Sequence, residues 1–102
     1  MAFLERAFAP DHPAAQGHFP GNPIIPGAVL LSEVLLAIEA DLGRRLQSCR
    51  VRSVKFLHPV RPGDRIRIEY SGRGDPGLRI TCSAGGRPVL AGEVWCDTSR
   101  PG

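Results

Sequence analysis

The order of the predicted elements indicates an α+β protein in which one antiparallel sheet packs against a single helix. A proline-rich loop is followed by a long apolar stretch with helical features. After it, apolar residues recur at every second position, which is the period of β-strands. Short turns separate these later segments, and strands joined by short turns pair antiparallel.

The helix is expected from residue 27 to residue 42. Pro26 suits the first turn of a helix, where its missing N–H costs nothing. Gly43 is a natural C-terminal cap, and Arg44 and Arg45 suit the negative end of the helix dipole. Apolar residues occupy most positions from 28 to 38. The helix should therefore be buried on most of its sides.

The strands are read from alternation and from the turns between them. The turn signals are Pro62-Gly63-Asp64 and Gly85-Gly86, and residues 71–77 are expected to form a hairpin loop. A sheet of this kind has exposed edges, which pairing across a two-fold axis would cover. The sequence therefore predicts a homodimer, or a higher multiple of dimers, with a continuous sheet. Strands are expected over residues 3–9, 49–56, 65–70, 78–82 and 88–96.

Composition limits the class of protein. With 102 residues, a single domain over residues 1–102 is expected. The net charge of +3 would suit an acidic partner, whereas the few aromatic residues do not interleave with basic ones as nucleic-acid binding requires. No apolar run approaches the roughly 20 residues of a membrane span, and residues 1–9 lack a signal-peptide core, so a cytoplasmic location is expected. The cysteines form no CxxC pattern, so free thiols and no metal site are expected.

The segment before the helix is the main candidate for a functional site. It reads Gly17-His18-Phe19-Pro20-Gly21-Asn22-Pro23-Ile24-Ile25-Pro26-Gly27. The prolines recur at every third position and stiffen the loop that holds His18. Long loops in small domains are usually functional or disordered, and a stiff loop favours function. His12 and His58 lack such a setting.

Together with a second segment, this motif resembles the bacterial 3-hydroxyacyl-carrier-protein dehydratases over nearly the whole chain. The second segment is Val54-Lys55-Phe56-Leu57-His58-Pro59-Val60-Arg61-Pro62-Gly63-Asp64. The resemblance implies the hotdog fold, an antiparallel sheet wrapped around one central buried helix. The short stretch before the motif is more similar to small dehydratase-like proteins of secondary lipid and aryl-polyene pathways. An acyl carrier protein or acyl-CoA is the implied partner, and no cofactor is implied.

The implied reaction removes a proton from C2 of a 3-hydroxyacyl thioester and expels the C3 hydroxyl. It needs a base that works near neutral pH, and His18 is the expected base. By resemblance, the Gly27 N–H would bind the thioester oxygen at the start of the helix. The Ile24 carbonyl would orient the imidazole. The acyl chain would run beside the helix, against Phe19, Leu30 and Val34.

The acid that the reaction needs is missing at its usual place. The family has Asp or Glu five residues after the last glycine of the motif, and here that residue is Ser32. Glu33 follows, but one helical step turns a side chain by about 100°. A serine hydroxyl is a poor general acid, although it can hold a water or a substrate hydroxyl. Ser32 and Glu33 are therefore the candidates on the acid side. A non-catalytic acyl-binding or partner subunit and a hotdog thioesterase are the alternatives to a dehydratase.

Overall fold

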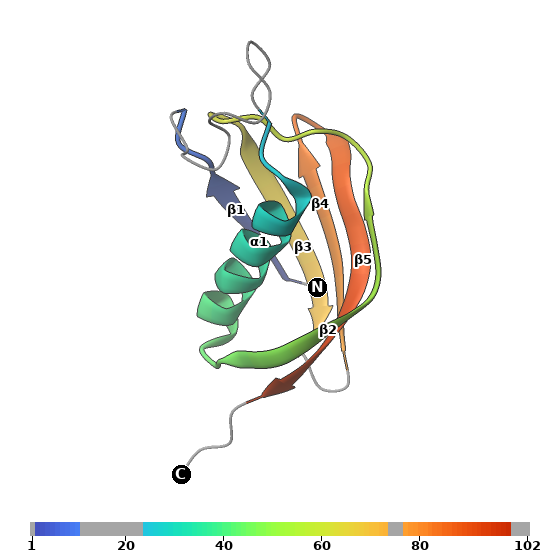
Figure 1. The fold of residues 1–102 in the computed structure, drawn as a ribbon. Helices are drawn as coiled ribbons and strands as arrows, with labels where there is room; N and C mark the ends of the chain where they lie inside the picture. Colours follow the sequence, from blue (N-terminus) through green and yellow to red (C-terminus); the bar gives the residue numbers. More distant parts are fainter. Residues whose placement is uncertain (1, 11–23, 74–76, 99–102) are drawn as a thin grey trace.

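The fold is one antiparallel sheet with a helix lying against one of its faces (Figure 1). The computed structural model describes residues 2–10, 24–73 and 77–98. The strands pair in the order β1-β3-β4-β5-β2, so β1 and β2 are the edges. The predicted α+β class is therefore confirmed. The elements are β1 (Ala2–Ala7), α1 (Gly27–Leu42), β2 (Leu46–Phe56), β3 (Arg65–Gly72), β4 (Leu78–Ala84) and β5 (Arg87–Thr98).

The ends of α1 follow from local chemistry. The helix has the predicted bounds, but Pro26 is its N-cap residue rather than part of its first turn, with φ −57° and ψ 145°. The Pro26 carbonyl accepts a hydrogen bond from the Leu30 amide at 2.9 Å. At the other end, Gly43 adopts the left-handed conformation, and its N–H donates to the Glu39 carbonyl. Glycine adopts that conformation without steric cost, which is why the helix ends there.

The core lies between the helix and the inner face of the sheet. In β3 and β4 the buried and exposed residues alternate as predicted. Each strand therefore contributes every second side chain to the core. The fully buried core side chains in the strands include Ile66, Ile68, Leu78, Ile80, Leu90 and Val94.

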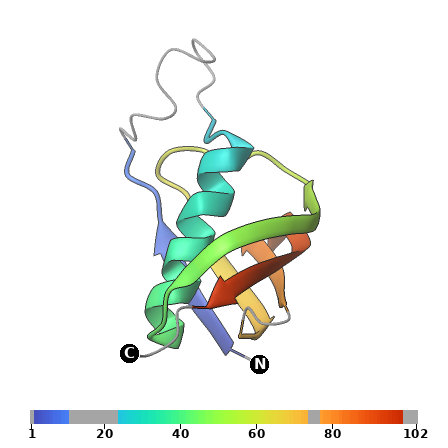
Figure 2. The ribbon, with the colours of Figure 1, turned by 60° about the horizontal axis from the view of Figure 1, so that its bottom comes forward.

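The helix is buried or partly buried around most of its circumference, as predicted, and its exposed residues form one stripe: Ala28, Ser32, Leu36, Ala40 and Asp41. Its buried residues are Leu30, Val34, Ala37 and Ile38. Leu36 is 54% exposed although it is apolar. Val29, Leu31, Leu35 and Leu42 are partly buried and pack against the core. Figure 2 shows the helix lying along the curved sheet, with β2 bending away from the end of α1.

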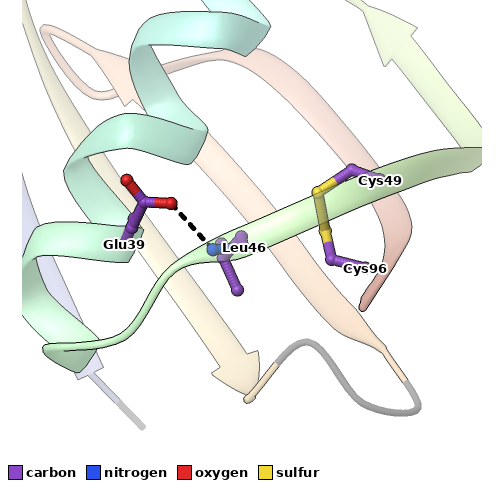
Figure 3. The surroundings of a disulfide bond; sticks show 4 residues. All are labelled: Glu39, Leu46, Cys49 and Cys96. Carbon is purple, nitrogen blue, oxygen red and sulfur yellow. Dashed lines mark hydrogen bonds between the residues drawn. A yellow bond between two sulfur atoms is a disulfide. The ribbon is translucent and has the colours of Figure 1, made fainter. Parts of the chain in front are cut away.

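Two contacts hold the start of β2 (Figure 3). The Leu46 amide donates to the Glu39 carboxylate at 2.7 Å, which ties the strand to the helix. A disulfide joins Cys49 to Cys96 of β5, and the two Cα atoms are 3.9 Å apart. The expectation of free thiols is therefore wrong for this pair, because strand pairing brings together cysteines that are 47 residues apart in sequence. Cys82 is free and buried, as expected.

The observed strands are mostly longer than predicted. β2 begins three residues before the predicted start at residue 49, and its pairing with β5 shifts register twice. Each shift changes which face the following side chains point to, so buried and exposed residues do not alternate regularly along β2. No helix in residues 2–10, 24–73 and 77–98 is long and apolar enough to cross a membrane.

Candidate functional site

An apolar hollow opens at the start of α1. Its volume is about 520 Å³. The wall on one side comes from the segment that leads into the helix, and the wall on the other side comes from the end of β2 and the turn after it. The two motifs singled out in the sequence therefore meet at one place. The lining residues are Ile24, Ile25, Pro26, Gly27, Leu30, Phe56, Leu57, His58, Pro59 and Val60.

A backbone hydrogen bond fixes this meeting of the two motifs. The Ile25 amide donates to the Val60 carbonyl at 2.7 Å. Both side chains are nearly fully buried, with exposed fractions of 4% and 1%. Ile24, the residue before, lines the hollow. The end of the proline-rich motif is thus anchored to the turn before β3, which gives the hollow a defined wall.

Gly27 lies at the first position of the helix and beside the hollow. The first amides of a helix have no partner within the helix and point outward from its N-terminus. The ring of Phe56 covers Gly27 so closely that a Cβ at this position would lie 2.9 Å from the ring. A glycine therefore leaves space for the ring. This placement suits the predicted role of the Gly27 N–H as a donor to a developing oxyanion.

The two residues proposed for the acid side do not line this hollow. Ser32 is exposed on the helix surface. Glu33 points towards β1, where one carboxylate oxygen lies 3.1 Å from Nη2 of Arg6. The Glu33 side chain is 27% exposed. The ion pair therefore directs the Glu33 carboxylate to the sheet edge.

The other predicted site residues are divided between the hollow and the core. Leu30 lines the hollow, whereas Val34 is fully buried in the core and does not line it. His18 and Phe19 lie outside the described residues. Their roles stay predictions, and so does the orienting role of the Ile24 carbonyl.

His58 is a polar residue of the hollow that the sequence did not single out. Its Nδ1 lies 2.8 Å from the Pro88 carbonyl oxygen. A carbonyl oxygen only accepts, so Nδ1 carries the proton in this contact. His58 belongs to the second motif, directly before Pro59, but its neighbours in sequence do not indicate that it faces a hollow.

The groups with shifted pKa values lie away from the hollow. Burial raises the pKa of the Cys82 thiol to about 12. Burial, together with the hydrogen bond that its hydroxyl donates to Asp41, raises the pKa of Tyr70 to about 12. Both side chains belong to the core of the sheet. Within the described part of the chain, no cluster of His, Cys, Asp or Glu is arranged to hold a metal ion.

Sequence comparison with protein families gives a match over most of the chain. The family described as ApeI-like, ApeI dehydratase, matches residues 2–92. Among curated proteins, the chain is 32% identical over 99 residues to the 3-hydroxyacyl-[acyl-carrier-protein] dehydratase FabZ of Jannaschia sp. (strain CCS1). That alignment covers 87% of this chain and 61% of the relative. The chain thus spans less than two thirds of the relative's length.

Solved structures agree with this fold. An uncharacterized protein from Erwinia carotovora subsp. atroseptica aligns with a TM-score of 0.73 and 25% identity, covering 93% of this chain and 81% of its own. A chain of the dehydratase heterocomplex ApeI:P from Xenorhabdus doucetiae aligns with a TM-score of 0.69 and 20% identity, covering 96% and 86%. The predicted hotdog fold is confirmed.

Proposed function

Because the chain belongs to the ApeI-like dehydratase family, we propose that it removes water from a 3-hydroxyacyl thioester to give a trans-2-enoyl thioester. The observation that carries the proposal is the apolar hollow at the start of α1, which Gly27 and Leu30 line. The acyl chain occupies the hollow, and the Gly27 N–H stabilises the charge that develops on the thioester oxygen. His18 removes the C2 proton. The FabZ relative, named as acting on a carrier-protein substrate, supports this substrate class.

The departure of the hydroxyl needs a proton donor, and this chain has no carboxylate in the hollow among its described residues. Ser32 is exposed and Glu33 is paired with Arg6. Glu33 serves as the acid only if a partner or the substrate draws it away from Arg6. An exposed ion pair of this kind is worth less than about 1 kcal/mol, so such a rearrangement is energetically accessible.

Dimer formation is part of the proposal. β2 is a long edge strand, and unpaired edge strands favour pairing with another chain. Apolar side chains lie exposed along β2 and just after it: Val51 is 55%, Phe56 51% and Leu57 44% exposed. Pairing of β2 with its copy would continue the sheet and cover these residues. The homodimer is therefore the expected assembly.

A second candidate function is that of a subunit that binds acyl chains while another chain supplies the general acid. The observation that favours it is the absence of a carboxyl at position 32, together with the Arg6–Glu33 pair. The similar chain in the complex named ApeI:P belongs to a dehydratase heterocomplex. In this case β2 pairs with a different hotdog chain, and the isolated protein binds acyl thioesters without turnover.

One set of assays separates these functions. The purified protein is mixed with a 3-hydroxyacyl carrier protein, and mass spectrometry follows the loss of water. The dehydratase proposal expects turnover that His18→Ala abolishes, with His12→Ala as the matched control that keeps it. Full activity in His18→Ala would refute the mechanism. Acyl binding without turnover, with activity gained in Ser32→Asp, would instead support the partner subunit.

Glu33→Gln adds a test of the acid. Loss of turnover with an unchanged KM is expected if Glu33 donates the proton. The control is Arg6→Gln, which removes the same ion pair but leaves the carboxyl in place. If both variants keep full activity, Glu33 has no part in the reaction. Release of free thiol from acyl-CoA would point to the thioesterase alternative.

A further inference from the structure

A second hollow adjoins the apolar one and carries three arginines. We call it the arginine cleft, and its volume is about 640 Å³. Its charged residues come from the turn between β2 and β3, from the start of β3 and from the start of β5. In Figure 1 these segments lie at the same end of the sheet as the start of α1. The lining residues used here are His58, Pro59, Arg61, Asp64, Arg65 and Arg87.

The arginine cleft and the apolar hollow are neighbours with a common wall. His58 and Pro59 line both. A molecule that passes over these two residues therefore reaches an apolar site at one end and a cationic site at the other. This pairing of an apolar and a cationic compartment restricts the ligands that fit both.

The positive charge of the cleft is largely uncompensated. Arg61 and Arg87 are exposed and form no ion pair with any residue within the described ranges. Arg65 has a loose contact with Glu5 at 3.6 Å, and its side chain is 73% exposed. Asp64, the carboxylate among the described lining residues, accepts a hydrogen bond from the Arg61 amide at 2.9 Å. One carboxylate oxygen of Asp64 is therefore engaged within the turn.

Hydrogen bonds hold the frame of the cleft. The Asp64 amide donates to the Arg61 carbonyl at 3.0 Å, and the Gly63 amide donates to the Phe8 carbonyl at 2.8 Å. On the other side, Leu57 donates to Val89 and His58 to Pro88. The turn that carries Arg61 and the start of β5, which carries Arg87, are therefore fixed relative to each other. A fixed site loses less entropy when it binds a ligand.

The charge pattern also indicates which part of the cleft an anion prefers. Beyond Arg65, the neighbouring surface carries Glu5 and Glu69, and Arg67 is paired with Glu69 at 3.2 Å. Carboxylates repel an anion there. The favourable position lies between Arg61 and Arg87, on the side of the apolar hollow.

We propose that the arginine cleft binds the phosphate group of a phosphopantetheine arm whose thioester end lies in the apolar hollow. This inference rests on the proposed function, because it places the carrier end of the same substrate. A phosphopantetheine thioester has an apolar acyl chain at one end and a phosphate at the other. Guanidinium groups bind phosphate oxygens through paired, charge-assisted hydrogen bonds. Coenzyme A and carrier proteins both supply such an arm, and both share this phosphate.

The test compares two probes that differ only in the phosphate. The binding of an acyl-phosphopantetheine and of the matching acyl-pantetheine is measured by calorimetry. Wild-type protein is expected to bind the phosphorylated probe on the order of 10-fold more tightly, as a difference of about 1.4 kcal/mol requires. In Arg61→Gln/Arg87→Gln this preference falls below about 2-fold, while the Kd of acyl-pantetheine stays the same. Arg79→Gln is the control, since Arg79 is exposed, pairs with Glu93 and does not line the cleft.

The outcomes distinguish this inference from the function on which it rests. Equal binding of both probes by wild-type protein would refute the phosphate site and leave the acyl site standing. An equal loss for both probes in the double variant would also refute it. Binding of neither probe would overturn the proposed function itself. The affinities of acyl-CoA and of acyl carrier protein are then compared between wild-type protein and the double variant. The natural source of the arm is the one that loses more affinity in the double variant.

Discussion

The disulfide between Cys49 and Cys96 attaches an edge strand to the sheet, and breaking it tests how far the fold depends on that attachment. Among the described residues, β2 pairs with β5 alone. The bond lies near one of the two register shifts of this pairing, between Gln47 and Arg50. Reduction leaves both side chains in place and removes only the covalent link. We therefore expect a change in stability without a change of fold.

The size of the change follows from the length of the closed loop. The cysteines are 47 residues apart in sequence. In the chain-entropy model, a link that closes a loop of this length stabilises the folded state by about 4 kcal/mol at 25 °C. For a domain of this size each kcal/mol shifts Tm by about 4–8 °C. Reduction should therefore lower Tm by on the order of 15 °C or more.

The assay is urea unfolding of the oxidised and the reduced protein, followed by the fluorescence of Trp95, a neighbour of Cys96. Cys49→Ala/Cys96→Ala is the matched control, and its free energy of unfolding should not change when reductant is added. Mass spectrometry of the alkylated protein reports the state of the thiols before each measurement. Equal unfolding free energies for the two redox states, within about 1 kcal/mol, would refute the reasoning, because a link of typical strength contributes more than that.

Three further predictions concern other contacts. Tyr70→Phe removes the hydrogen bond to the Asp41 carboxylate and should cost about 2 kcal/mol in urea unfolding. Because folding raises the pKa of Tyr70 from 10 to about 12, the contribution of Tyr70 to the unfolding free energy is complete below pH 10 and is lost as pH rises towards 12. The unfolding free energy of Tyr70→Phe should not show this loss over the same pH range. Arg6→Gln removes the ion pair with Glu33 and should cost less than about 1 kcal/mol, since the Arg6 side chain is 44% exposed. Cys82 is fully buried with its pKa raised to about 12, so a thiol reagent at pH 8 should leave it unmodified until urea unfolds the protein; rapid labelling in native buffer would contradict this.

Much of the fold could be predicted because its signals are local. The bounds of α1 depend on Pro26 and Gly43, whose backbone preferences act within one turn of the helix. The strands β3 and β4 show their period in the residue types themselves. β2 was harder to predict. Its register shifts are set by its pairing with β5, a strand more than thirty residues later in the chain.

The candidate site shows the same division. The motif that ends at Gly27 and the turn around Pro59 were both recognisable as patterns of neighbouring residues. Their meeting around one hollow depends on the hydrogen bond between Ile25 and Val60 and on the approach of the Phe56 ring to Gly27. The role of His58 in the wall was missed for this reason, since no neighbour in sequence indicates that it faces a cavity.

The sequence by itself determined the family, the α+β class and the position of the helix, because each depends on a motif or a period that is written along the chain. Only the tertiary structure decided which distant side chains meet. It paired Glu33 with Arg6 across 27 residues and Cys49 with Cys96 across 47. It also brought Arg61 and Arg87 to one cleft. Such contacts depend on how the chain is folded through the sheet, and the spacing of residues in the sequence does not indicate it.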